Sequence, residues 1–155
     1  MSRRRYISTN MGRDAKLAAL GARGDYLAIL LYTMAVPHAD DWGRLTGDPL
    51  EFKLTVCPAF EASVEEIDAA LDRVAGVGLW QRYDVAGKRV IAYPLETYYR
   101  YQSYIPQAKR GDDRASAFPA PPSDEQRESP HATADQRIAP QDDAKDRYPS
   151  PSPSP

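Results

Sequence analysis

The stretch from Ser63 to Tyr93 constrains the fold most, because it predicts one helix followed directly by one β-hairpin. Ser63 and Glu66 have the spacing of a capping box, in which each side chain binds the backbone N–H of the other residue. Apolar residues then recur at the spacing of one helical face, at Ile67, Ala70, Leu71 and Val74. Gly76 and Gly78 follow, and a glycine at this place ends a helix at low cost. We therefore expect the helix to end near residue 77.

From Leu79 onward the side chains alternate with a period of two, which is typical of a β-strand. Ala86 and Gly87 form a two-residue turn before a second strand that begins at Lys88. A capped helix, a glycine break and a hairpin with a basic tip are typical of the second half of a winged helix-turn-helix. This shape favours nucleic-acid binding first and protein interaction second.

The preceding residues supply the rest of such a domain. We expect a short amphipathic helix within residues 10–20 that Gly21 ends, and a core helix over residues 26–36, apolar almost all round, that Pro37 ends. Residues 42–46 predict a third strand. Asp48 and the following proline predict the start of a helix over residues 49–56. The predicted fold class is α+β: a winged helix-turn-helix of three to four helices with a small three-stranded antiparallel sheet.

The composition changes after this domain. The stretch from Gly111 to Pro155 holds 9 of the 14 prolines and few large apolar residues, which predicts disorder. We therefore expect a basic N-terminal arm over residues 1–10, a winged-helix domain over 11–105 and a proline-rich disordered tail over 106–155. Removing the chain from Gly111 onward should leave folding intact.

Charge and cysteine content narrow the function. Residues 1–110 carry 15 basic and 13 acidic side chains, whereas the remainder carries 5 and 9, so nucleic-acid binding would need a local basic cluster. The sequence shows neither a signal peptide nor a long apolar span, so we expect a cytoplasmic protein of the bacterial host, associated with the nucleoid and not with a membrane. Cys57 is the only cysteine and is expected in the core.

No catalytic or cofactor site is evident. His38 stands near Asp40 and Asp41, but these carboxylates are better explained as turn residues than as metal ligands. The other histidine, His131, lies in the predicted tail, and no glycine-rich phosphate loop follows a strand. We expect no cofactor, no metal and no enzymatic activity.

Several segments resemble a known family. They are Tyr6-Ile7-Ser8, Leu31-Tyr32-Thr33, the run from Pro37 to Pro49, Gln102 to Pro106, Lys109-Arg110 and Phe118-Pro119. Together they resemble the N-terminal winged-helix domain of bacteriophage replication-initiation proteins, the DnaD-like replisome organisers. The resemblance covers about residues 5–122, and Asp40 to Pro49 is its most specific part. It implies a winged-helix domain that acts at a phage or prophage origin of replication.

The helix predicted from Ser63 carries acidic residues where a recognition helix would meet DNA. These residues would repel phosphates, which argues against reading the major groove with this helix; they are Glu65, Glu66, Asp68 and Asp72. Either this acidic face binds a partner protein or it is simply solvated.

Positive charge lies elsewhere in the sequence. Candidate nucleic-acid contacts are Arg3, Arg4 and Arg5 in the arm, Arg44, Arg82, Lys88 and Arg89 on the predicted sheet, and Arg100, Tyr104, Lys109 and Arg110 beyond the hairpin. A basic wing can follow the backbone or enter the minor groove, and tyrosines among basic residues suit single strands. For the arm, a solvated terminus is favoured over phosphate binding, and Tyr98 and Tyr101 are expected to cover the core.

These observations leave three hypotheses. The first is a protein that binds duplex or single-stranded DNA during phage replication initiation, and it predicts that changing Lys88 and Arg89 to Glu weakens binding. The second is a protein-interaction module that presents Glu65, Glu66 and Asp72 to a replisome or primosome protein or to a second copy. The third is a transcriptional repressor with the same fold.

Overall fold

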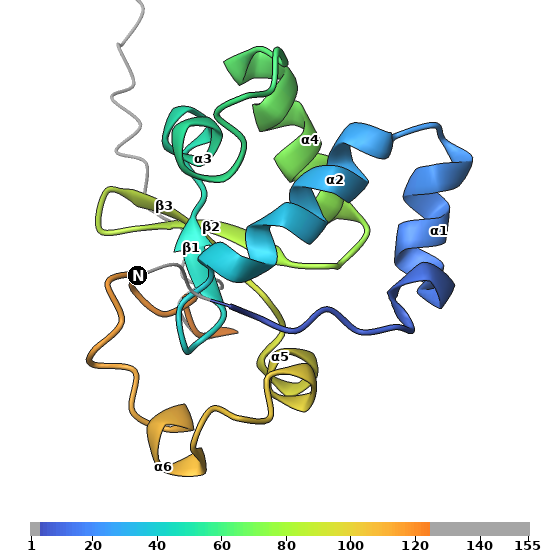
Figure 1. Cartoon of the computed structure of the whole chain (residues 1–155). Coiled ribbons are helices and arrows are strands. Elements are labelled where there is room, and N and C mark those ends of the chain that lie inside the picture. The colour runs from blue at the N-terminus through green and yellow to red at the C-terminus, as the bar shows by residue number, and fades with distance from the viewer. Residues whose placement is uncertain (1–3, 125–155) are drawn as a thin grey trace, which may run out of the picture. The chain divides into compact units, whose positions relative to one another are not determined.

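The computed structural model describes residues 4–124, and within them the chain forms an α+β winged helix (Figure 1). The sheet has three antiparallel strands in the order β1-β3-β2, which are β1 (Arg44–Thr46), β3 (Lys88–Ala92) and β2 (Gln81–Val85). The helices are η1 (Met11–Arg13), α1 (Ala15–Ala22), α2 (Tyr26–Ala35), η2 (Val36–His38), α3 (Pro49–Val56), α4 (Val64–Gly76), α5 (Leu95–Tyr101) and α6 (Gln107–Arg110). The predicted fold class is therefore confirmed.

The helix and hairpin that were predicted from residue 63 onward are both present. Both hydrogen bonds of the capping box form, from Ser63 N to Glu66 Oε2 at 2.7 Å and from Glu66 N to Ser63 Oγ at 3.1 Å. In the hairpin turn, Ala86 and Gly87 have φ values of 51° and 74°. Positive φ at both positions is what a type I′ turn requires, and this turn matches the twist of the two strands it joins.

Two helices differ in detail from the prediction. α1 begins at Ala15 because the Asp14 carboxylate accepts from the backbone N–H of Lys16 and Leu17, and it continues through Gly21 instead of ending there. α2 is not buried on most sides, since Tyr26 and Leu30 face outward. The apolar composition of α2 therefore predicted more burial than this helix has.

The core lies between the helices and one face of the sheet. Its largest fully buried side chains come from several elements and include Leu20, Leu31, Leu45, Phe52, Ile67, Leu71 and Ile91. Trp80, which directly precedes β2, packs with them and donates from Nε1 to the carbonyl of Leu71 at 3.1 Å. Cys57 is buried, as expected. The core therefore fixes α4 against the start of the hairpin.

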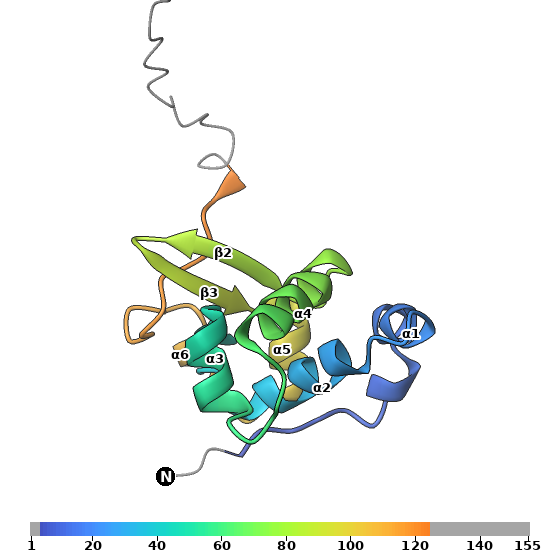
Figure 2. The same cartoon turned by 90° about the horizontal axis from the view of Figure 1, so that it is seen from above.

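The other face of the sheet is covered by residues that were assigned to a disordered tail. Residues 111–122 pass along this face (Figure 2), and Phe118 packs against Tyr83 and Val90. The Tyr83 hydroxyl donates to the carbonyl of Pro119 at 2.7 Å. The predicted domain boundary at residue 106 is therefore wrong, because the chain up to Ser123 packs into one compact unit. The tail predicted for residues 125–155 lies outside the described residues.

The N-terminal residues are also part of the domain. The Gln102 side chain binds the backbone of Tyr6, so this segment is not a free arm. Residues 1–3, and Arg3 with them, lie outside the described residues. None of the helices between residues 4 and 124 has the length and apolar character needed to cross a membrane.

Candidate nucleic-acid interface

Arg44 was predicted to contact DNA from the first strand, but its side chain is buried beneath residues 111–122. Its guanidinium pairs with Asp113 at 2.7 Å and donates to the carbonyl of Phe118 at 3.0 Å. Asp40 accepts from the backbone N–H of the same arginine at 2.9 Å. Arg44 therefore fastens this segment to the sheet and does not reach solvent, which corrects the prediction.

Arg82 is likewise occupied, between β2 and α4. Its side chain is 7% exposed and pairs with Asp68 at 2.5 Å and with Asp72 at 2.7 Å. It also donates twice to the carbonyl of Gly47. A residue so enclosed cannot bind a phosphate without giving up these bonds, so the prediction that Arg82 contacts DNA is also wrong. Its role is to hold the hairpin against α4.

The tip of the hairpin is uncovered, as the sequence suggested, but it carries little net positive charge. The Arg89 guanidinium donates to Asp84 at 3.0 Å and lies 3.9 Å from Asp68. The bond from Arg89 lowers the pKa of the Asp84 carboxyl, so this pair stays charged at neutral pH. Lys88 is exposed, with its Nζ 3.5 Å from the carbonyl of Ala117. Of the two wing cations, only Lys88 is free of a carboxylate.

The outer face of α4 is acidic, as predicted. Glu65 is exposed and has no ion pair within the described residues, whereas the Glu66 carboxylate is used by the capping box. Asp72 remains largely exposed although it pairs with Arg82. Carboxylates on this face oppose the approach of a phosphate backbone. The helix that reads the major groove in many winged helices is therefore unsuited to that role here.

A different surface forms where the N-terminal segment meets the region around α5. Gln102 is buried, and its amide both accepts from Tyr6 N at 3.1 Å and donates to Tyr6 O at 2.7 Å. The Arg5 side chain is only 4% exposed and pairs with Asp41 at 2.9 Å. It also donates to the hydroxyl of Tyr104. The prediction that Arg5 grips phosphate is thus corrected: this arginine positions Tyr104.

Three tyrosine rings are open to solvent on this surface. Tyr6 and Tyr104 are 66% and 47% exposed and meet edge to face with their centroids 5.6 Å apart. Tyr101 is 38% exposed, so it does not simply cover the core as expected. Arg4 is exposed and has no partner within the described residues, and Arg100 is exposed with a distant contact to Glu96 at 3.5 Å. Exposed aromatic rings and exposed arginines therefore belong to the same two segments, the N-terminal one and the region around α5.

The two basic residues of α6 have different environments. The Arg110 guanidinium lies 4.8 Å from the centre of the Tyr99 ring and donates to the carbonyls of Ile105 and Ser103. Arg110 therefore stabilises the loop between α5 and α6. The Lys109 side chain is exposed, while its carbonyl accepts from Trp42 Nε1 at 2.9 Å. Only Lys109 is available to an external ligand.

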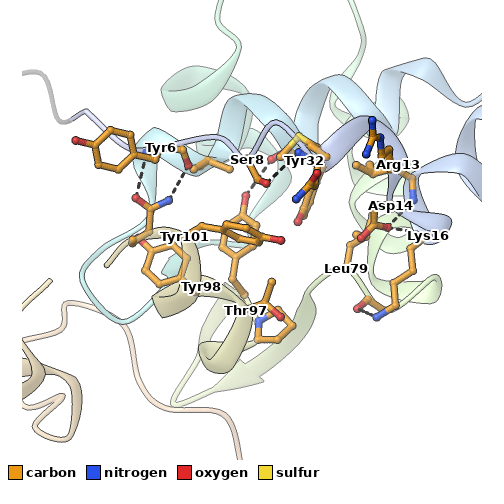
Figure 3. Close-up of a pocket in the computed structure, with 18 residues that line it drawn as sticks. Tyr6, Ser8, Arg13, Asp14, Lys16, Tyr32, Leu79, Thr97, Tyr98 and Tyr101 are labelled. Atoms are coloured by element: carbon orange, nitrogen blue, oxygen red, sulfur yellow. Dashed lines mark hydrogen bonds between the residues drawn. The ribbon is translucent and has the colours of Figure 1, made fainter. Parts of the chain in front are cut away.

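A groove of about 330 Å³ lies between the N-terminal segment, α1 and α5 (Figure 3). Its walls include the rings of Tyr32 and Tyr101 and the side chain of Arg13. The sequence reasoning did not identify these three residues as site residues. The sequence shows many tyrosines, but a groove between distant segments forms only where Gln102 binds the N-terminal segment beside α5.

The described part of the chain contains no group of three or more metal-ligating side chains, and His38 lies in η2. Against known proteins, the chain matches no protein-family model, no curated protein and no solved structure.

Proposed function

We propose that this protein binds single-stranded DNA during the initiation of phage or prophage DNA replication. The contact surface that we propose is the tyrosine face, defined as Arg4, Tyr6, Arg100, Tyr101 and Tyr104. The replication role rests on the resemblance of the Asp40 to Pro49 stretch to phage replication-initiation proteins. On this proposal the protein works on DNA in the cytoplasm of a bacterial host.

One observation carries the proposal: the N-terminal segment and the region around α5 carry three solvent-open tyrosine rings and two exposed arginines, neither of which has a short ion pair. Tyr6 and Tyr104 are exposed, and each base stacked on such a ring is worth about 1–3 kcal/mol. Arg4 is unpaired and Arg100 is 3.5 Å from its nearest carboxylate, so neither must give up a strong ion pair to meet a phosphate. Exposed rings and exposed arginines on the same segments favour a strand whose bases are unstacked.

The distribution of negative charge favours a single strand over a duplex in the usual winged-helix pose. That pose would bring phosphates toward Glu65 and Asp72 on α4. It would also depend on Arg89, which is already paired with Asp84. The residues of the tyrosine face belong to the N-terminal segment and to α5 and the loop after it, and α5 lies apart from α4 (Figure 1). A strand bound there avoids the acidic helix.

A second function is favoured by the exposed carboxylates of α4. Glu65 has no ion pair within the described residues and Asp72 is largely exposed, so this face suits a basic protein surface. On this reading α4 would recruit a replisome protein while the tyrosine face holds DNA. A Glu65→Gln, Asp72→Asn variant should then lose a partner that the unchanged protein captures, without losing DNA.

The proposal is tested by titrating the protein into fluorescently labelled oligo(dT) and into a duplex of equal length, at several salt concentrations. We expect tighter binding to oligo(dT), with an affinity that falls as salt rises because phosphates are neutralised. Equal or tighter binding to the duplex would contradict the proposed strand preference. No binding to either would contradict the proposed function.

A further inference from the structure

The groove beside the tyrosine face has an aromatic floor. Tyr93 and Tyr98 stack there with centroids 5.8 Å apart and an interplanar angle of 23°. Tyr32 packs against Tyr93 at 5.5 Å, and its ring forms part of the wall. Figure 3 shows Tyr32, Tyr98 and Tyr101 around the same opening. A planar ring entering this groove would meet aromatic carbon on more than one side.

Hydrogen-bonding groups also line the groove without partners. The hydroxyls of Tyr32 and Thr97 make no hydrogen bond within the described residues, and both residues line the groove. Burial, with Asp14 and Tyr101 nearby, raises the pKa of Tyr32 to about 12, so its hydroxyl stays a neutral donor. Unpaired polar groups in the lining of a groove provide places where the edge of a polar ring can bind.

One rim of the groove is positively charged. Arg13 is exposed and has no ion pair within residues 4–124. Lys16 Nζ lies on the same rim and donates to the carbonyl of Gly78 at 3.0 Å. The only carboxylate of the lining is Asp14, whose Oδ1 accepts from the backbone N–H groups of Lys16 and Leu17 at the start of α1. Two cations and one carboxylate leave this lining with a net positive charge, which suits a phosphate.

We infer that this groove holds one unstacked nucleotide of a DNA single strand, with the base against Tyr32 and Tyr101 and a phosphate near Arg13. The inference rests on the proposed function and adds a base-binding site to it. Ligand pockets run from about 300 to 1,000 Å³, so a groove of about 330 Å³ suits a single small ring system with its sugar. Tyr6, which also lines the groove, links it to the tyrosine face.

The first test uses the unchanged protein and an oligo(dT) in which one base is replaced by photoreactive 5-iodouracil. After irradiation, mass spectrometry identifies the crosslinked peptide. We expect a crosslink at Tyr32 or Tyr101. Crosslinks confined to residues outside the groove would overturn the inference, and they would leave single-strand binding intact.

The second test fills the groove and leaves every tyrosine and every charge in place. Thr97 is exposed on α5 and lines the groove, so Thr97→Trp should occupy it. Thr55→Trp makes the same change at an exposed position of α3 and serves as the matched control. Losing one stacked base predicts about a ten-fold weaker affinity for oligo(dT) in Thr97→Trp only.

The outcomes separate the groove from the wider function. If Thr97→Trp binds oligo(dT) with unchanged affinity, the groove does not hold a base, whereas binding of the single strand by the tyrosine face remains supported. An equal loss in both tryptophan variants would also reject it, because the effect would not be local. Absence of binding in the unchanged protein would reject both proposals.

Discussion

The buried amide of Gln102 forms two hydrogen bonds with the backbone of Tyr6, although 96 residues separate them. This pairing resembles the exchange between neighbouring strands, but one partner is a side chain. It fixes the N-terminal segment against the end of α5 and thereby sets where the exposed Tyr6 ring lies. The proposed DNA surface depends on this pairing.

Replacing Gln102 by Leu should lower the free energy of unfolding by about 2 kcal/mol, because two hydrogen bonds are lost and the Tyr6 groups are left unpaired. Affinity for oligo(dT) should fall as well, since Tyr6 would no longer be held. Gln107→Leu, at an exposed position of α6, is the control. Chemical denaturation measures the free energy of unfolding, and titration with oligo(dT) measures the affinity. A variant that loses stability but keeps full affinity for oligo(dT) would show that Tyr6 is not part of the DNA-binding surface.

Arg82 should matter for stability and not for direct DNA contact. Arg82→Met keeps much of the side-chain length but leaves Asp68 and Asp72 without their partner. We expect a loss of about 1.5–3 kcal/mol, the range for hydrogen bonds to charged groups. Lys88→Met, on the exposed wing, should change the free energy of unfolding by less than about 0.5 kcal/mol. Equal values for the two variants would contradict this assignment.

The segment of residues 111–122 should be required for full stability. A chain ending after Ser123 keeps the Arg44 and Phe118 contacts, whereas a chain ending after Arg110 loses them. The shorter chain should therefore melt at a lower temperature than the longer one, since the apolar cluster and the guanidinium of Arg44 become exposed. Identical melting temperatures of the two chains, measured by circular dichroism, would instead support the domain boundary at residue 106 that the sequence predicted.

The sequence predicted the elements whose signals are local. The capping box of Ser63, the Asp48 cap and the Ala86-Gly87 turn each act within a few residues, and the structure has all three. The sequence predicted poorly those side-chain environments that depend on residues far away in the chain. Arg44 and Arg82 look like surface cations in the sequence, and only tertiary structure brings Asp113 to one and Asp68 to the other.

The segment after Gly111 was misjudged for a related reason. Its composition is poor in large apolar residues, and composition predicts disorder when averaged over a long window. One apolar side chain, Phe118, and bonds to residues far away in the sequence, such as those of Arg44 and Tyr83, hold this short segment on the sheet. Such a contact leaves no periodic pattern.

The ion pair between Arg73 and Asp25 should make stability depend on pH in acid. The bond from Arg73 lowers the pKa of the Asp25 carboxyl below its ordinary value of 3.8. A lowered folded-state pKa stabilises the protein above the unfolded value, and this contribution disappears as pH falls through the folded one. We expect Arg73→Gln to cost about 0.5–1 kcal/mol at pH 7.

That difference between the original protein and Arg73→Gln should stay constant from neutral pH down to about pH 5 and should shrink below the ordinary carboxyl pKa of 3.8. Denaturation of both proteins across this range measures it directly. A difference that is unchanged at the acid end would show that Arg73 stabilises the fold by packing and not through the charge of Asp25.

The central claim is that DNA meets the tyrosine face and not the wing. Two variants with the same change in charge decide it: Arg4→Glu with Arg100→Glu, and Lys88→Glu with Arg89→Glu. The affinity of each for oligo(dT) is measured by fluorescence anisotropy at one salt concentration. We predict that the first variant loses at least about ten-fold in affinity and that the second stays within about three-fold of the original protein. A larger loss in the wing variant than in the Arg4 and Arg100 variant would contradict the account.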